Sequence, residues 1–332
     1  MIEEPRSRVR LLVVIVNYRT AELTIDCLRS LEEEVRALGG VHVVVTDNGS
    51  NDGSAERIAG ALVRQHWNDW AELLPLEHNR GYSAGNNAAI RPALEQDPPD
   101  YVLLLNSDTL VRPAALAELV RFMDAHPAVG IAGSRLEDLD GNQEHSGFRF
   151  PSMISELESG LRWGVFSRLV PDRVVAPAPV NVAHAVDWVA GASLMVRRQV
   201  FDDIGLLDEG YFLYFEEVDF CFKARRAGWS CWYLPESRVV HLVGRSTGVT
   251  VRRNPPRRPR YWWESRYRFF TRNYGRLYTF VTDLIWMAAY STWRVRRRLQ
   301  RKPDNDPPHM LADFLRFRLH PTRRSDPQAG EA

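Results

Sequence analysis

The chain has 332 residues, of which 45% are hydrophobic and 26% are charged, and its formal net charge is +1. These values are ordinary for a globular protein and allow one large α/β domain, or one such domain with an appendage. The three cysteines, Cys27, Cys221 and Cys231, show neither metal-ligand spacing nor an even-numbered framework. This excludes a disulfide scaffold and predicts buried thiols in a reducing compartment.

The N-terminus and the apolar runs argue against secretion and against a membrane span. The first residues, MIEEPRSRVR, are charged and lead directly into an apolar strand, so no signal peptide is expected. No apolar run approaches the roughly 20 residues that cross a bilayer. The longest candidate, Tyr278 to Tyr290, is shorter and contains Asp283. We therefore expect a cytoplasmic protein.

Residues 10 to 133 alternate between short apolar runs and segments with helical spacing. The expected strands cover residues 10–16, 41–46, 72–76, 101–105 and 129–133. The expected helices cover residues 20–38, 54–66, 82–97 and 113–125. Thr20 can cap the first helix, and Gly39-Gly40 can end it. The alternation predicts a parallel sheet covered by helices on both faces.

This rhythm is lost over residues 134–186, which are rich in Pro, Gly, Ser and isolated aromatic residues. Beyond them we expect a strand pair or a strand and turn over residues 186–197, a helix over 215–227 and a strand over 229–234. An amphipathic segment runs from Arg272 to Arg301, and a polar, Pro-rich tail follows it.

Polar residues follow the most apolar of the expected strands. This strand leads directly into Asn106, Ser107 and Asp108, and in an open α/β sheet ligands bind at the carboxyl ends of the strands. Asp108 could therefore hold Mg²⁺ or Mn²⁺, which take oxygen ligands and often share substrate phosphates. A helix cap is the alternative interpretation of a single Asp at this position.

A second polar loop, residues 47–54, follows the strand at residues 41–46. Asp47 at such a strand end can accept hydrogen bonds from a base N–H or from ribose hydroxyls. An Asx-turn is the alternative.

The segment Asn79 to Asn87 contains Gly81 and Gly85 where a helix is expected to begin. Glycines at this place let backbone N–H groups approach an anion, and Arg80 could add a charge-assisted contact to a diphosphate. The spacing Gly-x-x-x-Gly differs from the Gly-x-Gly-x-x-Gly pattern, which argues against a nicotinamide dinucleotide.

Acidic residues surrounded by aromatic residues form the last cluster. The aromatic residues around Glu216, Glu217 and Asp219 are Phe212, Tyr214, Phe215 and Phe220. Partial desolvation raises the pKa of a carboxyl group and suits a general base, whereas a solvated acidic face is the alternative. His241 lies after a later strand and could complete a metal shell as a neutral imidazole; a structural histidine is the alternative.

In this order and spacing, the motifs resemble those of the family 2 inverting glycosyltransferases with the GT-A fold. The motifs that carry the resemblance are VVIVNYRT, DNGSNDGS, NRGYSAGNN, YVLLLNSDT, WVAGASLMVRR and DEGYFLYFEEVDFCFKARRAGW. They run from about Leu11 to His241, and a weaker similarity continues to about Gly275. The rhamnosyltransferase-like branch, which acts on cell-envelope glycan or lipid-linked acceptors, is the most similar.

The resemblance implies a GT-A, Rossmann-like α/β domain over residues 1–250, with a nucleotide-sugar half (1–133) and an acceptor half (134–250). A basic, mainly helical extension over residues 251–332 would follow it. Asp108 and His241 would hold the metal, Mg²⁺ or Mn²⁺, and Glu217 or Glu216 would deprotonate the acceptor hydroxyl. The nucleotide-diphosphate sugar donor would contact Asn17, Asp47, Asn48, Arg80, Gly81, Asn86, Asn106 and Ser107. The acceptor would contact Trp188, Gly191, Ala192 and Asp219.

Two positions depart from the family pattern. Where the family has Asp-x-Asp, this chain has Asn106-x-Asp108, which leaves one strong metal ligand and implies a weaker or more hydrated metal site. The usual Glu-Asp or Asp-Asp is replaced by Glu216-Glu217. A glutamate keeps the base chemistry but adds a methylene, so either residue could be the base.

The resemblance implies an inverting, metal-dependent transferase, with L-rhamnose from dTDP-rhamnose as the best match for the sugar. The acceptor would be a hydroxyl of a cell-envelope glycan or of a polyprenyl-linked molecule. The alternatives are a non-catalytic nucleotide-sugar-binding subunit and a transferase that uses another donor, such as a UDP-sugar. A nucleotidyltransferase is not favoured, because the first strand leads into Asn-Tyr-Arg-Thr where that class has a glycine-rich, basic loop.

The segment from Arg252 to Arg301 is dense in arginine and aromatic residues. Nucleic-acid binding is one interpretation. A second is docking on the inner face of the cell membrane, because Trp and Arg on an amphipathic segment suit an anionic leaflet. A third is a helical subdomain that packs on the sheet and pairs protomers into a homodimer. Membrane docking and packing are favoured over nucleic acid, because a polyprenyl-linked acceptor needs access to the membrane interface.

Overall fold

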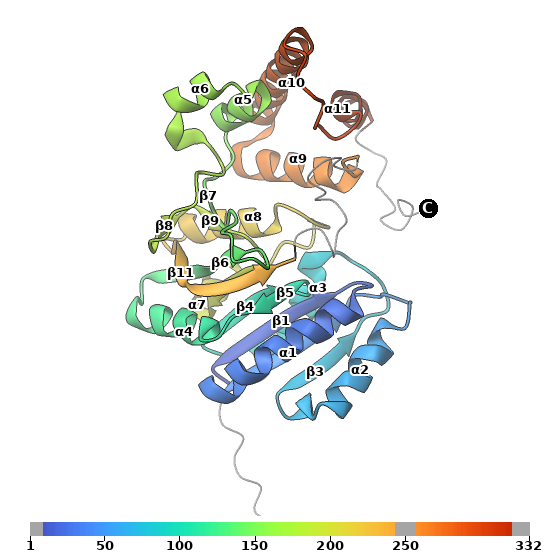
Figure 1. Ribbon diagram of the computed structural model, residues 1–332, viewed down its shortest axis with the longest axis vertical. Helices are drawn as coiled ribbons and strands as arrows, with labels where there is room; N and C mark the ends of the chain where they lie inside the picture. Colours follow the sequence, from blue (N-terminus) through green and yellow to red (C-terminus); the bar gives the residue numbers. More distant parts are fainter. Residues whose placement is uncertain (1–8, 243–256, 321–332) are drawn as a thin grey trace, which may run out of the picture.

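The structure, a computed structural model, describes residues 9–242 and 257–320. One large sheet with helices on both faces forms one end of the molecule, and a layer of helices forms the other (Figure 1). The strands of the large sheet are β1 (Leu11–Asn17), β2 (Val41–Asp47), β3 (Ala71–Pro75), β4 (Tyr101–Asn106), β5 (Thr109–Val111), β6 (Val129–Glu137), β8 (His184–Val186), β10 (Ser193–Arg197) and β11 (Ser230–His241). A small second sheet pairs β7 (Gly147–Phe148) with β9 (Trp188–Val189).

The large sheet runs in the order β3-β2-β1-β4-β10-β6-β11-β5, and β8 pairs with β11. The first four strands of this order are parallel to one another. Strand β10 lies antiparallel between β4 and β6, and β11 is parallel to β6. The carboxyl ends of β1, β2, β4 and β11 therefore lie at one edge of the sheet, where ligands bind in folds of this class.

Helices cover both faces of the sheet. They are α1 (Ala21–Leu38), α2 (Ser54–Arg64), α3 (Tyr82–Gln96), α4 (Ala115–Ala125), α7 (Arg198–Ile204) and α8 (Glu216–Arg226). Alternate residues of β1 point to opposite faces, so Val13 packs with α1, α2 and α4, whereas Val14 packs with α3, α7 and α8. Burial on both faces explains why β1 and β4 are continuous apolar runs and do not alternate with polar residues.

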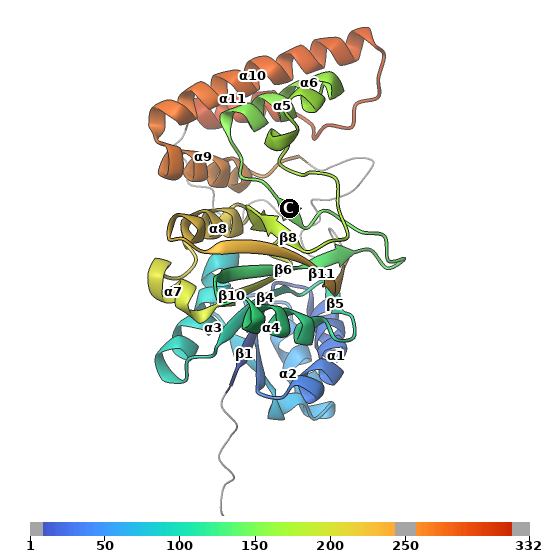
Figure 2. The ribbon, with the colours of Figure 1, turned by 90° about the vertical axis from the view of Figure 1, so that its left-hand side faces the viewer.

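The helical layer combines two parts of the chain. Its helices are α5 (Met153–Leu161), α6 (Gly164–Leu169), α9 (Arg260–Tyr274), α10 (Arg276–Leu299) and α11 (Met310–Leu319). Helix α5 packs along α10 (Figure 2), and a third core forms from Trp263, Trp286, Tyr290, Phe314 and Phe317. The buried Arg266 of α9 joins the layer, because its guanidinium lies 2.7 Å from both Glu156 of α5 and Asp283 of α10.

The predicted strands and helices of residues 10–133 are confirmed, as is the helix near residue 215. A strand pair over residues 186–197 is wrong: β9 pairs with β7, β10 pairs with β4 and β6, and a turn joins β9 to β10, which is the strand-and-turn alternative. All three cysteines are free and buried, as predicted. The sequence did not predict β5, α5, α7 or α11. The last predicted strand is also longer than expected: β11 passes through an irregularity between Leu234 and Arg238 and continues to His241.

Candidate functional site

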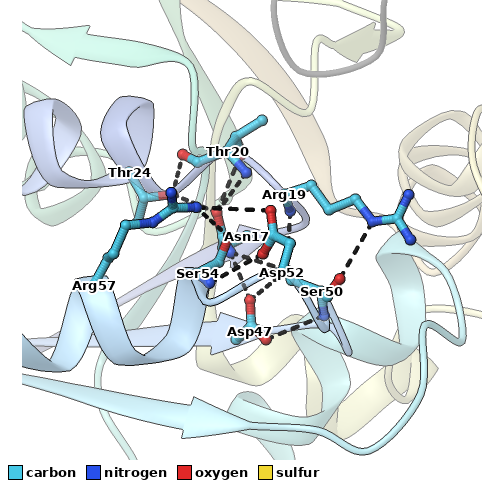
Figure 3. A network of polar contacts seen from close by, with 9 residues as sticks. All are labelled: Asn17, Arg19, Thr20, Thr24, Asp47, Ser50, Asp52, Ser54 and Arg57. Carbon is cyan, nitrogen blue, oxygen red and sulfur yellow. Dashed lines mark hydrogen bonds and ion pairs between the residues drawn. The ribbon is translucent and has the colours of Figure 1, made fainter.

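A network of polar side chains lies where β1 and β2 end (Figure 3). Asn17 lies beside Asp47 in the register of these strands, and Asn17 Nδ2 donates to Asp47 Oδ1 at 2.6 Å. Asp47 Oδ1 also accepts from Ser50 Oγ at 2.5 Å, and Asp47 Oδ2 accepts from the Ser50 N–H at 3.2 Å. The local turn that was the alternative for Asp47 is therefore present. A carboxylate has about four acceptor positions, so Asp47 Oδ2 can still accept one donor from a ligand.

Two threonines fix the orientation of the Asn17 amide. Asn17 Oδ1 accepts from Thr20 Oγ1 at 3.1 Å and from Thr24 Oγ1 at 2.9 Å, which leaves Nδ2 to face Asp47. Thr20 lies at the N-cap position of α1, as predicted, but its hydroxyl bonds to Asn17 and makes no cap hydrogen bond. Thr20 Oγ1 also lies 3.2 Å from Ser107 Oγ, so the loops after β1 and β4 are joined.

The glycine-bearing segment before α3 is held from two sides. Asn48 Nδ2 donates to Asn79 Oδ1 at 3.0 Å and to the Gly81 carbonyl at 3.1 Å. Gly81 has φ 94°, and a Cβ atom there would lie 2.7 Å from Phe212 Cα. Only glycine combines this backbone conformation with so close an approach, and the Tyr82 N–H can then donate to the Phe212 carbonyl at 2.8 Å.

Arg80 and Asn86, two predicted donor contacts, lie in different environments. The Arg80 side chain is 71% exposed, and its Nη2 lies 3.1 Å from Glu209 Oε2. Asn86 is fully buried, and its Nδ2 donates to the Tyr82 carbonyl at 2.9 Å. Its Oδ1 has no hydrogen-bond partner within residues 9–242 and 257–320. An unsatisfied buried amide oxygen is costly, which points to a donor from a ligand or water at this position.

Asp108 lies directly after β4 and is 1% exposed. The helix-cap interpretation is wrong, because β5 follows and the cap position of the next helix, α4, is Ala114. His241 ends β11 opposite Thr109 in the register, and its Nε2 lies 3.5 Å from Asp108 Oδ1. The backbone N–H of Leu242 donates to the Asp108 carbonyl at 2.9 Å. The structure thus brings together the two residues predicted to hold a metal.

The turn between β9 and β10 reaches the same edge. The backbone N–H of Asn106 donates to the Ala192 carbonyl at 3.1 Å, and Tyr82 Oη donates to the Gly191 carbonyl at 3.1 Å. A Cβ atom on Gly191 would lie 3.8 Å from Glu217 Cβ and 3.9 Å from Tyr82 Cε1. The segments that contain Tyr82, Gly191 and Glu217 are distant in the sequence, but they meet at Gly191.

Trp188 lies on the same segment, one strand earlier. Its Nε1 donates to the Arg149 carbonyl at 2.9 Å, and its ring stacks on Phe148 with 4.2 Å between the ring centroids. These contacts hold the indole in one orientation. Its role as a wall of an acceptor site stays a prediction.

The two glutamates at the start of α8 have unusual proton affinities. Burial raises the pKa of Glu217 to about 7. Burial and the negative charge of Glu217 raise the pKa of Glu216 well above its usual range. Glu216 therefore keeps its proton when Glu217 ionises, and such a separation assigns different roles to neighbouring carboxyls. The pKa of Tyr82 is also raised, by burial first and then by the charges of Glu216, Glu217 and Asp108, which places all three acids around this tyrosine.

The backbone that leads into α8 is strained. Tyr214 and Phe215 have φ values of 70° and 68°, in the left-handed region that costs a non-glycine residue about 1 kcal/mol or more. Such strain persists where the surroundings fix the conformation, and here it sets the direction in which Glu216 and Glu217 leave the chain.

Asp219, a predicted acceptor contact, is engaged elsewhere. Its Oδ2 lies 2.5 Å from Lys223 Nζ, and its Oδ1 accepts from Asn273 Nδ2 at 2.8 Å. Residues two apart on a helix point in nearly opposite directions, so Asp219 faces α9 while Glu217 faces Gly191. An acceptor contact at Asp219 stays a prediction that this geometry does not support.

A family model described as "Glycosyltransferase like family 2" matches residues 7–258 of the chain. The chain belongs to glycosyltransferase family 2. The activity that the sequence motifs implied, transfer of a sugar from a nucleotide-sugar donor, is confirmed at the level of this family.

The relatives of this glycosyltransferase include rhamnosyltransferases. The N-acetylglucosaminyl-diphospho-decaprenol L-rhamnosyltransferase of Mycobacterium tuberculosis is 31% identical over 223 residues, 63% of this chain and 68% of the relative. The dTDP-rhamnosyl transferase RfbF of Shigella flexneri is 22% identical over 255 residues, 76% of this chain and 78% of the relative. The predicted similarity to the rhamnosyltransferase-like branch is confirmed.

Solved structures confirm the predicted GT-A-like fold. The mannosyltransferase PcManGT of Pyrobaculum calidifontis, in complex with GDP-Man and Mn²⁺, matches with a TM-score of 0.57 and 16% identity, over 97% of this chain and 85% of that chain. GalNAc-T7 with UDP, GalNAc and Mn²⁺ matches with a TM-score of 0.55 and 15% identity, over 95% of this chain and 55% of that chain.

The residues of this glycosyltransferase fit a divalent metal with a small protein shell. Two ligands of one Mg²⁺ or Mn²⁺ ion at right angles lie about 3 Å apart, and the 3.5 Å between Asp108 Oδ1 and His241 Nε2 is close to this value. The part of the chain that the structure describes holds no group of three His, Cys, Asp or Glu residues that could bind a metal. Phosphate oxygens of the donor and water would complete the shell, as is usual for such ions.

Sequence reasoning missed Ser50 and Tyr82 in this site, and also Asn273, which contacts α8 on the side away from Gly191. Tyr82 directly follows Gly81, so it could have been found as the first residue of α3 in a motif already assigned to the donor. Ser50 lies in the polar loop that contains Asp47. Asn273 lies far away in the sequence, in an arginine- and aromatic-rich segment, and nothing there indicates its contact with α8.

Proposed function

We propose that this glycosyltransferase transfers L-rhamnose from dTDP-rhamnose to a hydroxyl of a glycan or lipid-linked acceptor, with inversion at the anomeric carbon. The names of the relatives from M. tuberculosis and S. flexneri support this donor and this class of acceptor. The observation that carries the chemistry is the position of Glu217 beside Gly191 and Tyr82, with its pKa raised to about 7. A base with this pKa is matched to proton transfer near neutral pH.

The donor would bind along the edge formed by β1, β2 and β4. The remaining acceptor position of Asp47 Oδ2 suits an N–H of a pyrimidine base, and the buried Asn86 Oδ1 suits a second donor group of the ligand. The N-terminus of α3 presents backbone N–H groups, which favour negative charge. Held there, the sugar would lie between the diphosphate and Glu217.

The reaction would proceed as one displacement. Ionised Glu217 accepts the proton of the acceptor hydroxyl while the hydroxyl oxygen attacks the anomeric carbon on the face opposite the nucleoside diphosphate. The new glycosidic C–O bond forms as the bond to the diphosphate breaks, so configuration inverts and no protein nucleophile is needed. When bound by Asp108 and His241, Mg²⁺ or Mn²⁺ would offset the charge on the departing diphosphate.

Release of nucleoside diphosphate tests this proposal. The full chain is incubated with dTDP-rhamnose, a UDP-sugar or a GDP-sugar, with Mn²⁺ or Mg²⁺ and a mixture of lipid-linked acceptors. We expect metal-dependent release from dTDP-rhamnose. Asp108→Ala should lower turnover by roughly 10²-fold or more, whereas Asp97→Ala, which removes an exposed acid after α3, should leave it unchanged.

Other results would point to the alternatives. Release only from a UDP-sugar would replace the donor, and nucleotide-sugar binding without any release would favour a non-catalytic subunit. Full activity of Asp108→Ala, with unchanged metal dependence, would contradict the role given to Asp108.

A further inference from the structure

Helix α10 carries apolar side chains on two opposite faces. One face, which includes Trp286, Ala289 and Tyr290, is buried against the rest of the helical layer. The other is formed by Leu277, Phe280, Leu284, Val295 and Leu299, whose exposed fractions lie between 45% and 80%. At 3.6 residues per turn these five positions fall within an arc of about 100°. We call these five residues the outer face of α10.

The outer face is long and lies at the end of the molecule. Helix α10 has 24 residues and is therefore about 36 Å long, and the outer face extends from its first turn to its last. Figures 1 and 2 both show α10 at the end farthest from α1 and α2. Among the residues that the structure describes, no helix is long and apolar enough to cross a bilayer.

Positive charge surrounds the outer face. Arg276 lies at its N-terminal end, and Arg298, Arg301 and Lys302 lie at its C-terminal end, all of them exposed. The acidic residue of α10, Asp283, is buried and paired with Arg266 and Arg318. No residue of α10 itself therefore exposes a carboxylate, and the nearby Asp304 is paired with Arg294 and Arg297 of α10.

We propose that α10 lies in the plane of an anionic lipid bilayer, with its outer face inserted among the headgroups. An amphipathic helix with Leu and Phe on one face and arginines beside it binds such surfaces through buried apolar area and charge attraction. A second copy of the chain is a poorer occupant of this face. Because both ends of α10 are cationic, parallel and antiparallel pairing would each bring like charges together, and the nearby Asp304 is already paired with Arg294 and Arg297.

Docking through α10 would place the candidate base at a fixed distance from the membrane. Arg266 Nη1 lies 2.7 Å from Asp283 Oδ1 and joins α10 to α9. Asn273 Nδ2 donates to Asp219 Oδ1 at 2.8 Å and joins α9 to α8, which carries Glu217. Such an arrangement suits an acceptor anchored in the bilayer by a lipid. This role rests on the proposed function, whereas binding of α10 to lipid does not.

Sedimentation with vesicles tests the docking surface. The full chain is mixed with vesicles of phosphatidylcholine alone or with phosphatidylglycerol added. We expect binding to the anionic vesicles that weakens as salt is added, because salt screens the charge attraction. Phe280→Glu combined with Leu284→Glu should lower the bound fraction about tenfold or more, because it removes apolar area and adds repulsion. The matched control is Val63→Glu, since Val63 is 63% exposed on α2 at the other end of the molecule, and it should bind as the wild type does.

Light scattering, which measures whether the chain is a monomer or a dimer, and an activity assay complete the experiment. Equal binding by the α10 variant and the wild type, or no binding of the wild type to anionic vesicles, would overturn the proposal. A wild-type dimer that the α10 variant converts to a monomer would overturn it in favour of a second copy. Turnover with a water-soluble acceptor should be the same for wild type and variant. If both lack turnover while only the wild type binds vesicles, the docking surface stands and the proposed function fails.

Discussion

Replacing Glu217 by glutamine tests whether its burial prepares a base at the expense of stability. The pKa of Glu217 is raised from 4.5 to about 7 by burial, so over this pH range the unfolded chain loses a proton that the folded chain keeps. Stability therefore falls as pH rises from about 4.5 to about 7, and the loss is complete above the folded-state pKa. At about 1.4 kcal/mol per pH unit the loss amounts to about 3 kcal/mol.

Glu217→Gln removes this cost together with the base. Above about pH 8 we expect the variant to be more stable than the wild type by about 3 kcal/mol, and below about pH 4.5 to be equally stable. Urea denaturation measured at a series of pH values gives both differences. Glu95→Gln, at an exposed position of α3, is the control and should follow the wild type at every pH.

The same substitution should remove activity in a recognisable way. In the wild type, kcat/KM should rise with pH through about 7 as Glu217 ionises. Glu217→Gln should lower kcat by roughly 10²- to 10⁴-fold, the usual contribution of a general base, while the affinity for donor, measured by calorimetry, should change little. If Glu217→Gln keeps wild-type turnover and the wild-type pH dependence of stability, burial does not act on this carboxyl as argued, and Glu216 becomes the candidate base.

Two further substitutions test contacts that hold the site and the helical layer in place. Gly81→Ala should cost more than Gly275→Ala, because both glycines have nearly the same conformation (φ 94° and ψ 172°, φ 92° and ψ 164°) but only Gly81 lies against Phe212. We expect about 1 kcal/mol for Gly275→Ala and about 2 kcal/mol more for Gly81→Ala in urea denaturation, with weaker donor binding only for the latter; equal costs would refute the close-packing argument. Arg266→Met should destabilise the fold by about 3–5 kcal/mol, because it removes the partner of the half-buried Glu156 and one of the two partners of the buried Asp283, which keeps only Arg318. Adding Glu156→Gln and Asp283→Asn to Arg266→Met should recover part of the loss, and a further loss of the same size would show that unpaired charge is not its cause.

Local patterns predicted most of the sheet and its helices, because burial on both faces forces continuous apolar runs on β1, β2 and β4. The missed elements have weaker signals. Strand β5 is three residues long, and α5 lies in a Pro- and Gly-rich region, although Ser152 and Ser155 form a capping box at its start. Strand β11 continues beyond residue 234 only because an irregularity in its pairing with β6 allows it to pass the polar residues 236–238. No periodicity in the sequence predicts such an irregularity.

The residues of the candidate site were identified by resemblance, but their arrangement needed the structure. Asp108 and His241 meet because β5 and β11 pair in one register, which depends on the irregularity in β11. The choice between Glu216 and Glu217 also stayed open in the sequence, because it depends on which side chain faces Gly191. The contact of Asp219 with Asn273 could not be predicted, since it forms across two helices that are distant in the sequence.

The contact between Asp219 and Asn273 indicates that the contacts holding α8 extend beyond the segment that matches the family model, which ends at residue 258. Helix α9 begins at Arg260 and contributes Phe269 and Phe270 to the core beneath α3 and α8. Its Ser265 donates to the Leu213 carbonyl at 2.9 Å, just before the strained residues that lead into α8. Removing the chain beyond the family segment would therefore expose this core and release the backbone that orients Glu217. A truncated protein that loses activity or membrane binding would not separate the two roles, whereas point substitutions on the outer face of α10 leave α9 in place and do separate them.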